Sequence, residues 1–584
     1  MQCVDYRDKA RLQLNRRTSL PEVDCFSVHW EASHPGSSLK DCILMDTNFT
    51  GVWWGLGDVT GGSLPLSSLQ NMEKTRLYTA EIQKHRIGGL LRKVLISSKG
   101  VSITIPSASK VFFSVESASE KDPGKFCLES DPDTDMTKRQ NLDYTICAGK
   151  DVYSILRNLN QIEAIDNIEF RSSKWHTGNR GALETISRMP EAPQYTKQEH
   201  DQAIFRMNCP IWRPWLPHHI IEMGQEDVMN YVRGIIKRNH FDMCGYVLLP
   251  STWQDKLGNF DFDKKRFPNP KSLSRALSRV GLRLAITLSP LIDTDSYQFM
   301  NFSKANFLIR QTNSTLPILV STKRSTAAGV MDFTNPNLAN WFSSKLKELK
   351  DMYDIDGFHL TPVNTLSLPP YRQQHSHQDN ADYAAREFIA AVSKVKPPIS
   401  TETAVIPVKA PTYLTAADGD GGWSMLTMLP NRVLSISSVG GSLVDSGVIG
   451  GWSDQKGHIP DADLYLRWLQ CSIFLPAFQI SVLPHMYDSA MEMHVKKLMQ
   501  MRRRFVIPRF RRMINETLKH DYPLVSPLAI MFPKDIKAIT IRDQWFIGQD
   551  LMVAPILRRG RSARDLYLPD GIWKDGLDDR LLEG

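Results

Sequence analysis

The sequence predicts an α/β protein in which a (β/α)8 TIM barrel follows an N-terminal β-sandwich and precedes a C-terminal β region. Three observations predict this architecture. Short strand-like runs dominate up to residue 195, strand-like and helix-like runs then alternate as far as residue 520, and β character returns afterwards. A chain of 584 residues is also too long for one compact core. We therefore expect three domains, at residues 20–195, 196–520 and 521–584.

The N-terminal part contains short apolar runs bounded by glycine, serine or proline. Residues 93–98 and 101–106 show this pattern, which is typical of strands in a sandwich. Strand-like and helix-like segments then alternate, at 209–215, 227–238, 245–250, 270–279, 282–290, 336–352 and 355–362. Alternation gives a parallel sheet with covering helices, and a closed barrel is its expected form at this length. A doubly wound sheet would need a glycine-rich phosphate turn after its first strand, and the sequence has none.

A long segment with helical apolar spacing, residues 488–520, follows the predicted barrel. Strand-like runs come after it, at 529–533, 545–557 and 565–569. The chain stops shortly after the last of these. We therefore expect the C-terminal β region to be incomplete and the chain to be part of a longer protein.

The composition is that of a soluble globular protein, with 42% hydrophobic and 23% charged residues and a mild net charge of +8. The densest basic run, Arg502 to Arg512, is the best candidate for a nucleic-acid or lipid patch. A solvated helix face explains the run better, so we expect no nucleic-acid partner. No run is long and apolar enough to span a membrane, and the N-terminus lacks the apolar core of a signal peptide.

The eight cysteines form no CxxC pair and no zinc-binding spacing, so we predict no metal site, and we predict no cofactor. Buried thiols and a few disulfides both fit their dispersed positions. Four sequons, which begin at Asn48, Asn301, Asn313 and Asn515, are candidates for glycosylation. We expect the secretory pathway lumen or the extracellular space as the location.

Several motifs occur in the order found in one enzyme family. Asp261-Phe-Asp, Phe267-Pro-Asn-Pro and the run 281–290 resemble the second and third barrel units of glycoside hydrolase family 31. Residues 331–336 resemble the segment that leads to that family's catalytic strand, and residues 546–555 its first strands after the barrel.

The resemblance covers nearly the whole chain, because residues 88–100 and 141–147 are similar to the family's N-terminal sandwich. Phe478-Gln-Ile-Ser resembles the myogenesis-regulating glycosidase branch, in which Gln and Ser stand where other members have Arg and His. The resemblance implies a TIM barrel and the hydrolysis of α-glycosidic bonds with retention.

Retaining hydrolysis uses two carboxylates about 5–5.5 Å apart, one as nucleophile and one as acid and base. The family's nucleophile motif resembles Phe-Lys-Phe-Asp-Ala-Gly-Glu, and this chain has Phe358-His-Leu-Thr-Pro-Val-Asn in the same register. Thr361 therefore stands at the nucleophile position, and Asn364 replaces the following Glu. A neutral hydroxyl with no adjacent base cannot replace a carboxylate. Asp356 lies five residues earlier on the same strand, about 16 Å away, which is too far.

The resemblance implies that the acid/base position is better preserved than the nucleophile position. The family commonly has an Asp five residues before a Trp, and Asp418 keeps that spacing to Trp423. Asp420 is the second candidate. The alternative is that these residues form an Asp/Gly turn with no catalytic role.

Other positions that face sugar in the family are changed as well. The second strand of the family usually ends Ile-Asp-Asp-x-Trp, where this chain has Leu249-Pro-Ser-Thr-Trp. Further losses fall at 62–65, 287–290 and 321–325. Trp212, Trp253 and Trp423 are candidate platforms for stacking on sugar rings, although packing in the core explains most tryptophans equally well.

Three functions remain open. The first is a family 31 scaffold that has lost its activity, a pseudoenzyme. The second is an active α-glucosidase or α-galactosidase with a relocated carboxylate, for which the candidates are Asp420, Asp445 and Asp454. The third is a non-catalytic protein that binds α-linked carbohydrate or a glycoprotein glycan. A homo-oligomer and a membrane anchor in a longer parent protein are further open alternatives.

Overall fold

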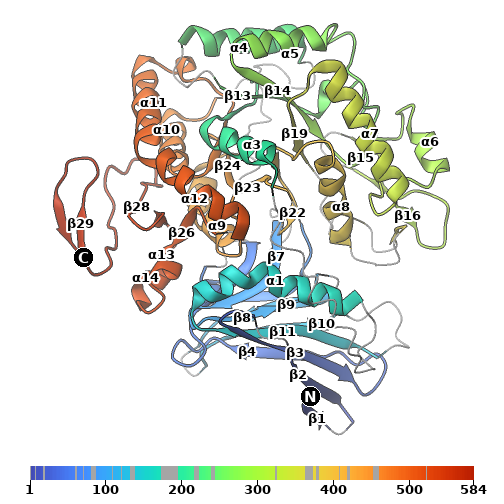
Figure 1. Cartoon of the computed structure of the whole chain (residues 1–584), viewed down its shortest axis with the longest axis vertical. Helices are drawn as coiled ribbons and strands as arrows, with labels where there is room; N and C mark the ends of the chain where they lie inside the picture. Colours follow the sequence, from blue (N-terminus) through green and yellow to red (C-terminus); the bar gives the residue numbers. More distant parts are fainter. Residues whose placement is uncertain are drawn as a thin grey trace.

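The computed structural model describes the chain except for residues 1, 7, 18–19, 60–61, 63, 70, 81–86, 108, 120–121, 132–138, 172–194, 216–222, 239–243, 322–324, 362–367, 369–371, 376–380, 407, 409, 417–420, 452–458 and 521. Two antiparallel sheets form the N-terminal part, below the barrel in Figure 1. The larger sheet has the order β1 (Gln2–Tyr6), β2 (Ala10–Arg16), β3 (Val23–Ala32), β11 (Asn141–Gly149), β8 (Val101–Thr104), β7 (Ile87–Ser97) and β22 (Ala404–Val405), with β5 (Trp53–Val59) also on β7.

The smaller sheet has the order β4 (Lys40–Leu44), β10 (Lys125–Ser130), β9 (Val111–Glu116) and β6 (Met72–Arg76), and the short helix η1 (Leu66–Ser68) precedes β6. The two sheets enclose a core of alternating apolar residues that includes Trp53, Phe113 and Phe126. Disulfides join directly opposed residues on neighbouring strands, Cys25 to Cys147 and Cys42 to Cys127. The apolar runs that predicted a sandwich form β7 and β8.

Eight parallel strands close into a barrel. In barrel order they are β12 (Ile211–Trp212), β13 (Gly245–Leu249), β14 (Leu282–Leu288), β19 (Gly357–Leu360), β21 (Ser400–Thr401), β23 (Tyr413–Thr415), β24 (Val444–Val448) and β25 (Ala477–Ile480). The helices that alternate with them are α3 (Lys197–Asn208), α4 (Gln225–Arg238), α5 (Pro270–Arg279), α7 (Pro336–Tyr353), α8 (Ala381–Ser393), α9 (Trp423–Ser437), α10 (Ala462–Ser472) and α11 (Ser489–Met501). The predicted (β/α)8 barrel is confirmed.

Local sequence signals set several of these helix ends. Thr196 and Glu199 form a reciprocal capping box at the start of α3. Asn269 caps α5 by accepting a hydrogen bond from the backbone N–H of Ser272, and a proline at the first position of the helix fixes its φ angle. The α7 helix ends at Asp354, which adopts the left-handed conformation.

Smaller elements decorate the barrel. The third disulfide, Cys209 to Cys244, joins the starts of the first two barrel strands. The insertions comprise η3 (Ser251–Trp253), β15 (Leu291–Asp293), α6 (Phe299–Lys304), β16 (Arg310–Gln311), β17 (Leu319–Val320), β18 (Ala328–Val330), β20 (Arg372–Gln373) and η5 (Pro484–Met486). The α1 helix (Val152–Arg171) lies between the N-terminal sheets and the barrel in Figure 1. No described helix has the length and apolar character needed to cross a bilayer.

The predicted helical segment 488–520 forms α11, a π-helical turn at Arg502–Val506, and α12 (Ile507–His520). The expected solvated face of this basic run is wrong for Arg502, which is fully buried. Its guanidinium donates to the carbonyl oxygens of Met207, Ile473, Leu475 and Pro476, and burial lowers its pKa to about 9. The first arginine of the run therefore anchors the helix to the end of the barrel.

The C-terminal part contains a sheet of β26 (Val525–Pro527), β27 (Trp545–Ile547) and β28 (Leu551–Val553), two short helices, α13 (Leu528–Met531) and α14 (Ile536–Thr540), and a hairpin of β29 (Ile572–Lys574) and β30 (Leu581–Glu583). The strand predicted at 529–533 is wrong, because Leu528, Ala529 and Ile530 bury their side chains as one helical turn. Residues 565–569 form no strand either. The backbone N–H of Tyr567 donates to the side chain of Gln544 instead of to a neighbouring strand.

The N-terminal sheets and the barrel form one body. The β22 strand belongs to a barrel loop yet pairs in parallel with β7 of the larger sheet. The Arg432 guanidinium on α9 donates two hydrogen bonds of 2.8 Å to the carboxylate of Asp58 on β5, and both side chains are buried. These contacts fix the orientation of the sheets on the barrel.

We expect Arg432→Met to lower the free energy of unfolding by about 3–5 kcal/mol, because it leaves the Asp58 carboxylate buried without a partner. The double variant Asp58→Asn/Arg432→Met should recover most of the loss. Urea unfolding measures both. The exposed pair Arg509 and Asp550 provides the control, and Asp550→Asn should cost about 1 kcal/mol or less. Equal losses for the two pairs would contradict the prediction.

Candidate functional site

One end of the barrel has very few charged groups next to its strands. The residues that directly follow the eight strands are Arg213, Pro250, Ser289, Thr361, Glu402, Ala416, Ile449 and Ser481. All eight belong to the described part of the chain, and Glu402 is the one acid among them. Catalytic groups in (β/α)8 enzymes come from this C-terminal end of the strands. A candidate site in this barrel is therefore expected around Glu402.

The register of the strands directs four polar side chains to the same face of the barrel wall. His359 on β19 is the partner of Ser400 on β21. Side chains two residues further along a strand point the same way, so Thr361 and Glu402 share this face. The strand pairing continues past the end of β21, because the backbone N–H of Glu402 donates to the carbonyl of Leu360.

His359 is the centre of the cluster. Its Nδ1 lies 2.7 Å from the Ser400 hydroxyl, and its Nε2 lies 2.8 Å from Oε1 of Glu402. The guanidinium of Arg213 approaches both partners, at 3.0 Å from Nε2 of His359 and 3.4 Å from Oε1 of Glu402. A carboxylate can only accept and a guanidinium can only donate. We therefore assign the Nε2 proton to the hydrogen bond with Glu402, and Arg213 pairs with that carboxylate as well.

Serine, histidine and a carboxylate in a row also occur in nucleophilic hydrolases, but the burial of Ser400 excludes that role. Its side chain and that of His359 are 0% and 1% exposed, so no substrate can reach the hydroxyl. The side chains of Glu402 and Arg213 keep 18% and 11% exposure. These two charged groups form the accessible edge of the cluster.

Thr361 lies at the position predicted for the nucleophile. Its hydroxyl donates to the carbonyl oxygen of Leu288 at 3.3 Å, and its backbone N–H donates to the same oxygen at 3.0 Å. The hydroxyl is thus held by the wall of the barrel. Among the described residues no base contacts it.

The other predicted catalytic residues lie outside the described part of the chain. These are Asp418 and Asp420, together with Asn364 and Asp454. Asp445, which was also considered as a relocated acid, is fully buried lower in the barrel. There it pairs with Arg206 and accepts a hydrogen bond of 3.0 Å from the Gln479 amide. A carboxylate in that position is a structural group and is inaccessible to a glycoside.

The predicted sugar platforms have little free surface. Trp212 and Trp253 are 0% exposed, and their indole N–H groups donate to the carbonyl oxygens of Cys244 and Thr287. Neither ring offers a face to a sugar in this structure. Trp423 at the start of α9 is half-buried and packs against the core of the barrel. The four sequon asparagines, Asn48, Asn301, Asn313 and Asn515, are all exposed.

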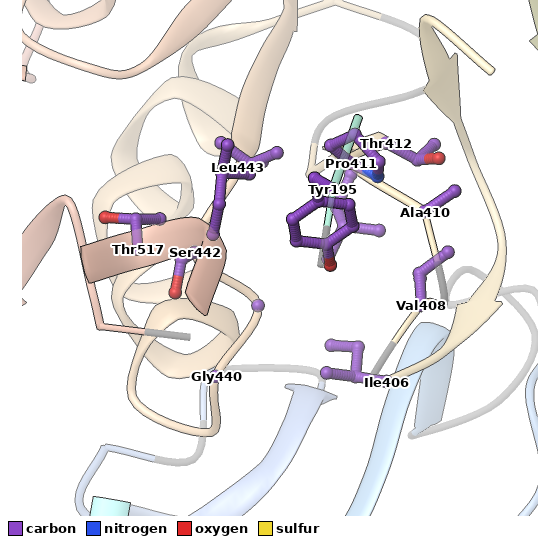
Figure 2. Close-up of a pocket in the computed structure, with 13 residues that line it drawn as sticks. Tyr195, Ile406, Val408, Ala410, Pro411, Thr412, Gly440, Ser442, Leu443 and Thr517 are labelled. Atoms are coloured by element: carbon purple, nitrogen blue, oxygen red, sulfur yellow. The ribbon is translucent and has the colours of Figure 1, made fainter. Parts of the chain in front are cut away.

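A small cavity lies elsewhere, near the starts of β23 and β24, and has a volume of about 40 Å3. Figure 2 shows Thr517 and Ser442 on one side of it and Val408 and Ala410 on the other. A cavity of this size holds a few water molecules at about 10–15 Å3 each, but no sugar ring. No group of three or more His, Cys, Asp or Glu side chains is placed to hold a metal ion in the described ranges.

Comparison with known proteins identifies the scaffold. The profile of the TIM-barrel domain of glycosyl hydrolases family 31 matches residues 218–406, and the profile of the C-terminal domain of the same family matches residues 521–584. The chain thus carries two domains of glycoside hydrolase family 31. The family 31 resemblance drawn from the sequence motifs is therefore confirmed.

Two curated relatives align over almost the whole chain. The mouse myogenesis-regulating glycosidase is 24% identical over 94% of this chain and 74% of its own length. The SITS-binding protein of Tetronarce californica is 22% identical over 100% of this chain and 78% of its own length. Solved family 31 structures show the same fold. The Flavobacterium johnsoniae dextranase superposes with a TM-score of 0.74 at 17% identity, covering all of this chain and 70% of that one.

Sequence reasoning missed the cluster of Arg213, His359, Ser400 and Glu402. Arg213 directly follows Trp212, and Glu402 directly follows Thr401, but β12 and β21 have only two residues each. So short a strand has no periodic pattern that would show where it ends. An alignment of strand ends within family 31 is the one signal that could have placed Arg213 and Glu402 together.

The hydrogen bonds of the cluster should contribute to the stability of the fold. Glu402→Gln and His359→Gln should each lower the free energy of unfolding by about 1–3 kcal/mol, because each leaves a buried polar group without its charged partner. A double-mutant cycle between the two sites should give a coupling energy between about 0.5 and 3 kcal/mol. Thr361→Val, which removes one weak hydrogen bond, should cost about 1 kcal/mol at most. Additive losses at His359 and Glu402 would show that the two side chains do not interact.

Proposed function

We propose that this family 31 chain has lost the retaining α-glycosidase reaction and persists as a pseudoenzyme. The proposal rests on the hydrogen bonds of two side chains, Thr361 and Glu402, which follow the neighbouring strands β19 and β21. Thr361, the residue predicted at the nucleophile position, has its hydroxyl hydrogen-bonded to the backbone, and Glu402 is already held by His359 and Arg213.

Retaining chemistry needs a carboxylate that can attack the anomeric carbon and a second one about 5–5.5 Å away. A threonine hydroxyl is neutral at pH 7 and needs an adjacent base before it can act as a nucleophile. Glu402 is a poor substitute. Its Oε1 oxygen faces the His359 ring at 2.8 Å, and a nucleophile in that arrangement would have to leave two partners that stabilise its charge.

Carbohydrate binding without turnover is the second candidate. The exposed parts of Arg213 and Glu402 supply hydrogen-bond donors and an acceptor at the mouth of the barrel, where sugar hydroxyls bind in enzymes of this fold. Relatives in the family act on α-linked sugars by name, among them an α-xylosidase and several α-glucosidases. An α-linked carbohydrate or a glycoprotein glycan is therefore the class of ligand we propose for this end of the barrel.

The disulfides bear on where the protein works. Six of the eight cysteines pair, two pairs across neighbouring strands and one between the starts of β12 and β13. Disulfides form and persist in oxidising compartments. They support our proposal that the protein folds in the secretory pathway and resides in its lumen or outside the cell.

The activity prediction is that the wild-type protein does not hydrolyse aryl α-glucosides, α-galactosides or α-xylosides above the spontaneous rate. A mechanism-based inhibitor that traps a glycosyl–enzyme intermediate should leave no adduct in a peptide mass map. Thr361→Asp, which restores a carboxylate at the nucleophile position, should remain inactive, since other positions that face sugar in the family are changed as well. Turnover by the wild type that Asp418→Ala abolishes would overturn the proposal. Calorimetry with α-linked disaccharides then tests binding separately.

Glycosylation tests the proposed compartment. Asn48 and Asn313 lie exposed in turns, whereas Asn301 and Asn515 lie in α6 and α12. Acceptor sequons belong to surface loops. We expect glycans on Asn48 and Asn313 after expression through the secretory pathway, and none on Asn515, whose side chain is hydrogen-bonded to His200. Peptide mapping before and after enzymatic removal of glycans measures this, and unmodified Asn48 and Asn313 in secreted material would contradict it.

A further inference from the structure

A second cavity, lined by polar side chains, lies at the N-terminal ends of the barrel strands and has a volume of about 590 Å3. It opens between α3 and the starts of the strands β14 and β19. Its lining consists of Lys197, Gln198, Asp201, Gln202, Arg283, Asp356 and Lys396. The cavity is separate from the cluster around His359, because it lies at the N-terminal ends of the strands.

Two side chains of opposite charge, neither of them held in an ion pair among the described residues, line this cavity. Asp356 precedes β19 and Lys396 precedes β21, and both are half-buried. Among the described residues no ion pair holds either side chain, and the backbone N–H of Leu284 donates to the Asp356 carboxylate. Burial raises the pKa of Asp356, although Lys396 and Arg283 oppose this, and burial lowers the pKa of Lys396, although Asp356 opposes it. The two charges are therefore partly desolvated, and no ion pair among the described residues compensates either of them.

Gln202 adds a buried acceptor. The side chain is only 5% exposed, and its amide group donates to the carbonyl oxygen of Pro397 at 2.7 Å. Its Oε1 atom is buried and accepts no hydrogen bond from the described part of the chain. A buried polar atom without a hydrogen-bond partner costs about 1–3 kcal/mol. A ligand that donates a hydrogen bond to this oxygen would therefore bind more tightly.

Arg283 is held in a fixed orientation. Its guanidinium carbon lies 3.6 Å from the centre of the Phe205 ring, and one of its nitrogens donates to the Tyr246 hydroxyl at 3.4 Å. A guanidinium stacked in this way keeps its other N–H groups available in one plane. Arg283 therefore presents a preorganised donor edge beside the unpaired charges.

We propose that this cavity binds a small hydroxycarboxylate. Its lining has three cations, Lys197, Arg283 and Lys396, against two anions, Asp201 and Asp356, so one carboxylate from a ligand balances the charge. A hydroxyl near that carboxylate supplies a hydrogen-bond donor to the Oε1 atom of Gln202 and to Asp356. The volume of about 590 Å3 falls within the range of about 300–1,000 Å3 that small-molecule sites have, and it admits a molecule as large as a sugar acid.

This inference does not rest on the proposed function at the other end of the barrel. Titration calorimetry of the full chain with D-glucuronate and L-lactate tests it, with D-glucose and acetate as matched probes that lack the carboxylate or the hydroxyl. We expect both hydroxycarboxylates to bind, and the two control probes to bind at least about tenfold more weakly, a difference of 1.4 kcal/mol.

Variants then locate the binding. Lys396→Met and Gln202→Leu should each weaken binding of D-glucuronate by about tenfold or more, since each removes one of the groups that contact the ligand. Lys394→Met is the matched control, because Lys394 lies two residues away on the exposed surface, and it should bind as the wild type does. Lys396→Met should also keep its thermal midpoint, because it removes a desolvated charge rather than a contact.

Three outcomes would overturn the proposal. The first is the absence of heat with either hydroxycarboxylate at millimolar concentration. The second is equal affinity for all four probes. The third is binding that Glu402→Gln abolishes while Lys396→Met does not, which would place the ligand at the C-terminal end of the barrel. That last result would leave the loss of glycosidase activity a separate question.

Discussion

Closure of the barrel between β12 and β25 is the constraint on which the rest of the structure depends. Ile211 pairs with Gln479 and Trp212 with Ile480, so the last strand completes the sheet that the first one began. Once the sheet is closed, side chains must alternate between the interior of the barrel and its helical shell. That alternation places His359, Thr361, Ser400 and Glu402 on one face, although they come from different segments. The cluster is thus a consequence of register and needs no further element to assemble it.

Buried arginines hold the scaffold together independently of any catalysis. Arg206 pairs with Asp445 inside the barrel, Arg432 pairs with Asp58 across to the larger sheet, and Arg502 donates to four backbone carbonyls at the end of the barrel. Removing one partner of a buried pair is costly, because the other charge stays behind without compensation. None of these groups lies at the accessible edge formed by Arg213 and Glu402. The contacts that hold this scaffold together therefore lie apart from the accessible edge of the candidate site.

The sequence predicted the parts of the fold that have a period. The strands β13, β14 and β19 come from apolar runs long enough to recognise, and the helices that alternate with them have apolar residues at helical spacing. The strands β12 and β21 have two residues each and no such pattern, so the sequence could not predict the pairing of Arg213 with Glu402. Composition also led to a wrong prediction at two places, one of secondary structure and one of burial. Leu528 to Met531 forms a helical turn although its residues suggest a strand, and Arg502 is buried although its neighbours in the basic run are exposed. In both cases, tertiary contacts decided between conformations that local sequence left open.

The two ends of the barrel differ in how far their polar groups are already satisfied. At the C-terminal end His359 hydrogen-bonds to Ser400 and Glu402, and Arg213 pairs with Glu402, so a ligand gains little unless it offers more than these partners do. At the N-terminal end the Oε1 atom of Gln202 is buried without a hydrogen-bond partner in the described chain, and Asp356 and Lys396 are partly desolvated without an ion pair there. A ligand gains most binding energy from polar groups that have no hydrogen-bond partner in the free protein. A group that already has a partner must break that hydrogen bond before it can bind the ligand. The N-terminal end of this barrel, which enzymes of this fold do not use for catalysis, therefore offers a buried acceptor, Oε1 of Gln202, that a ligand hydroxyl can satisfy.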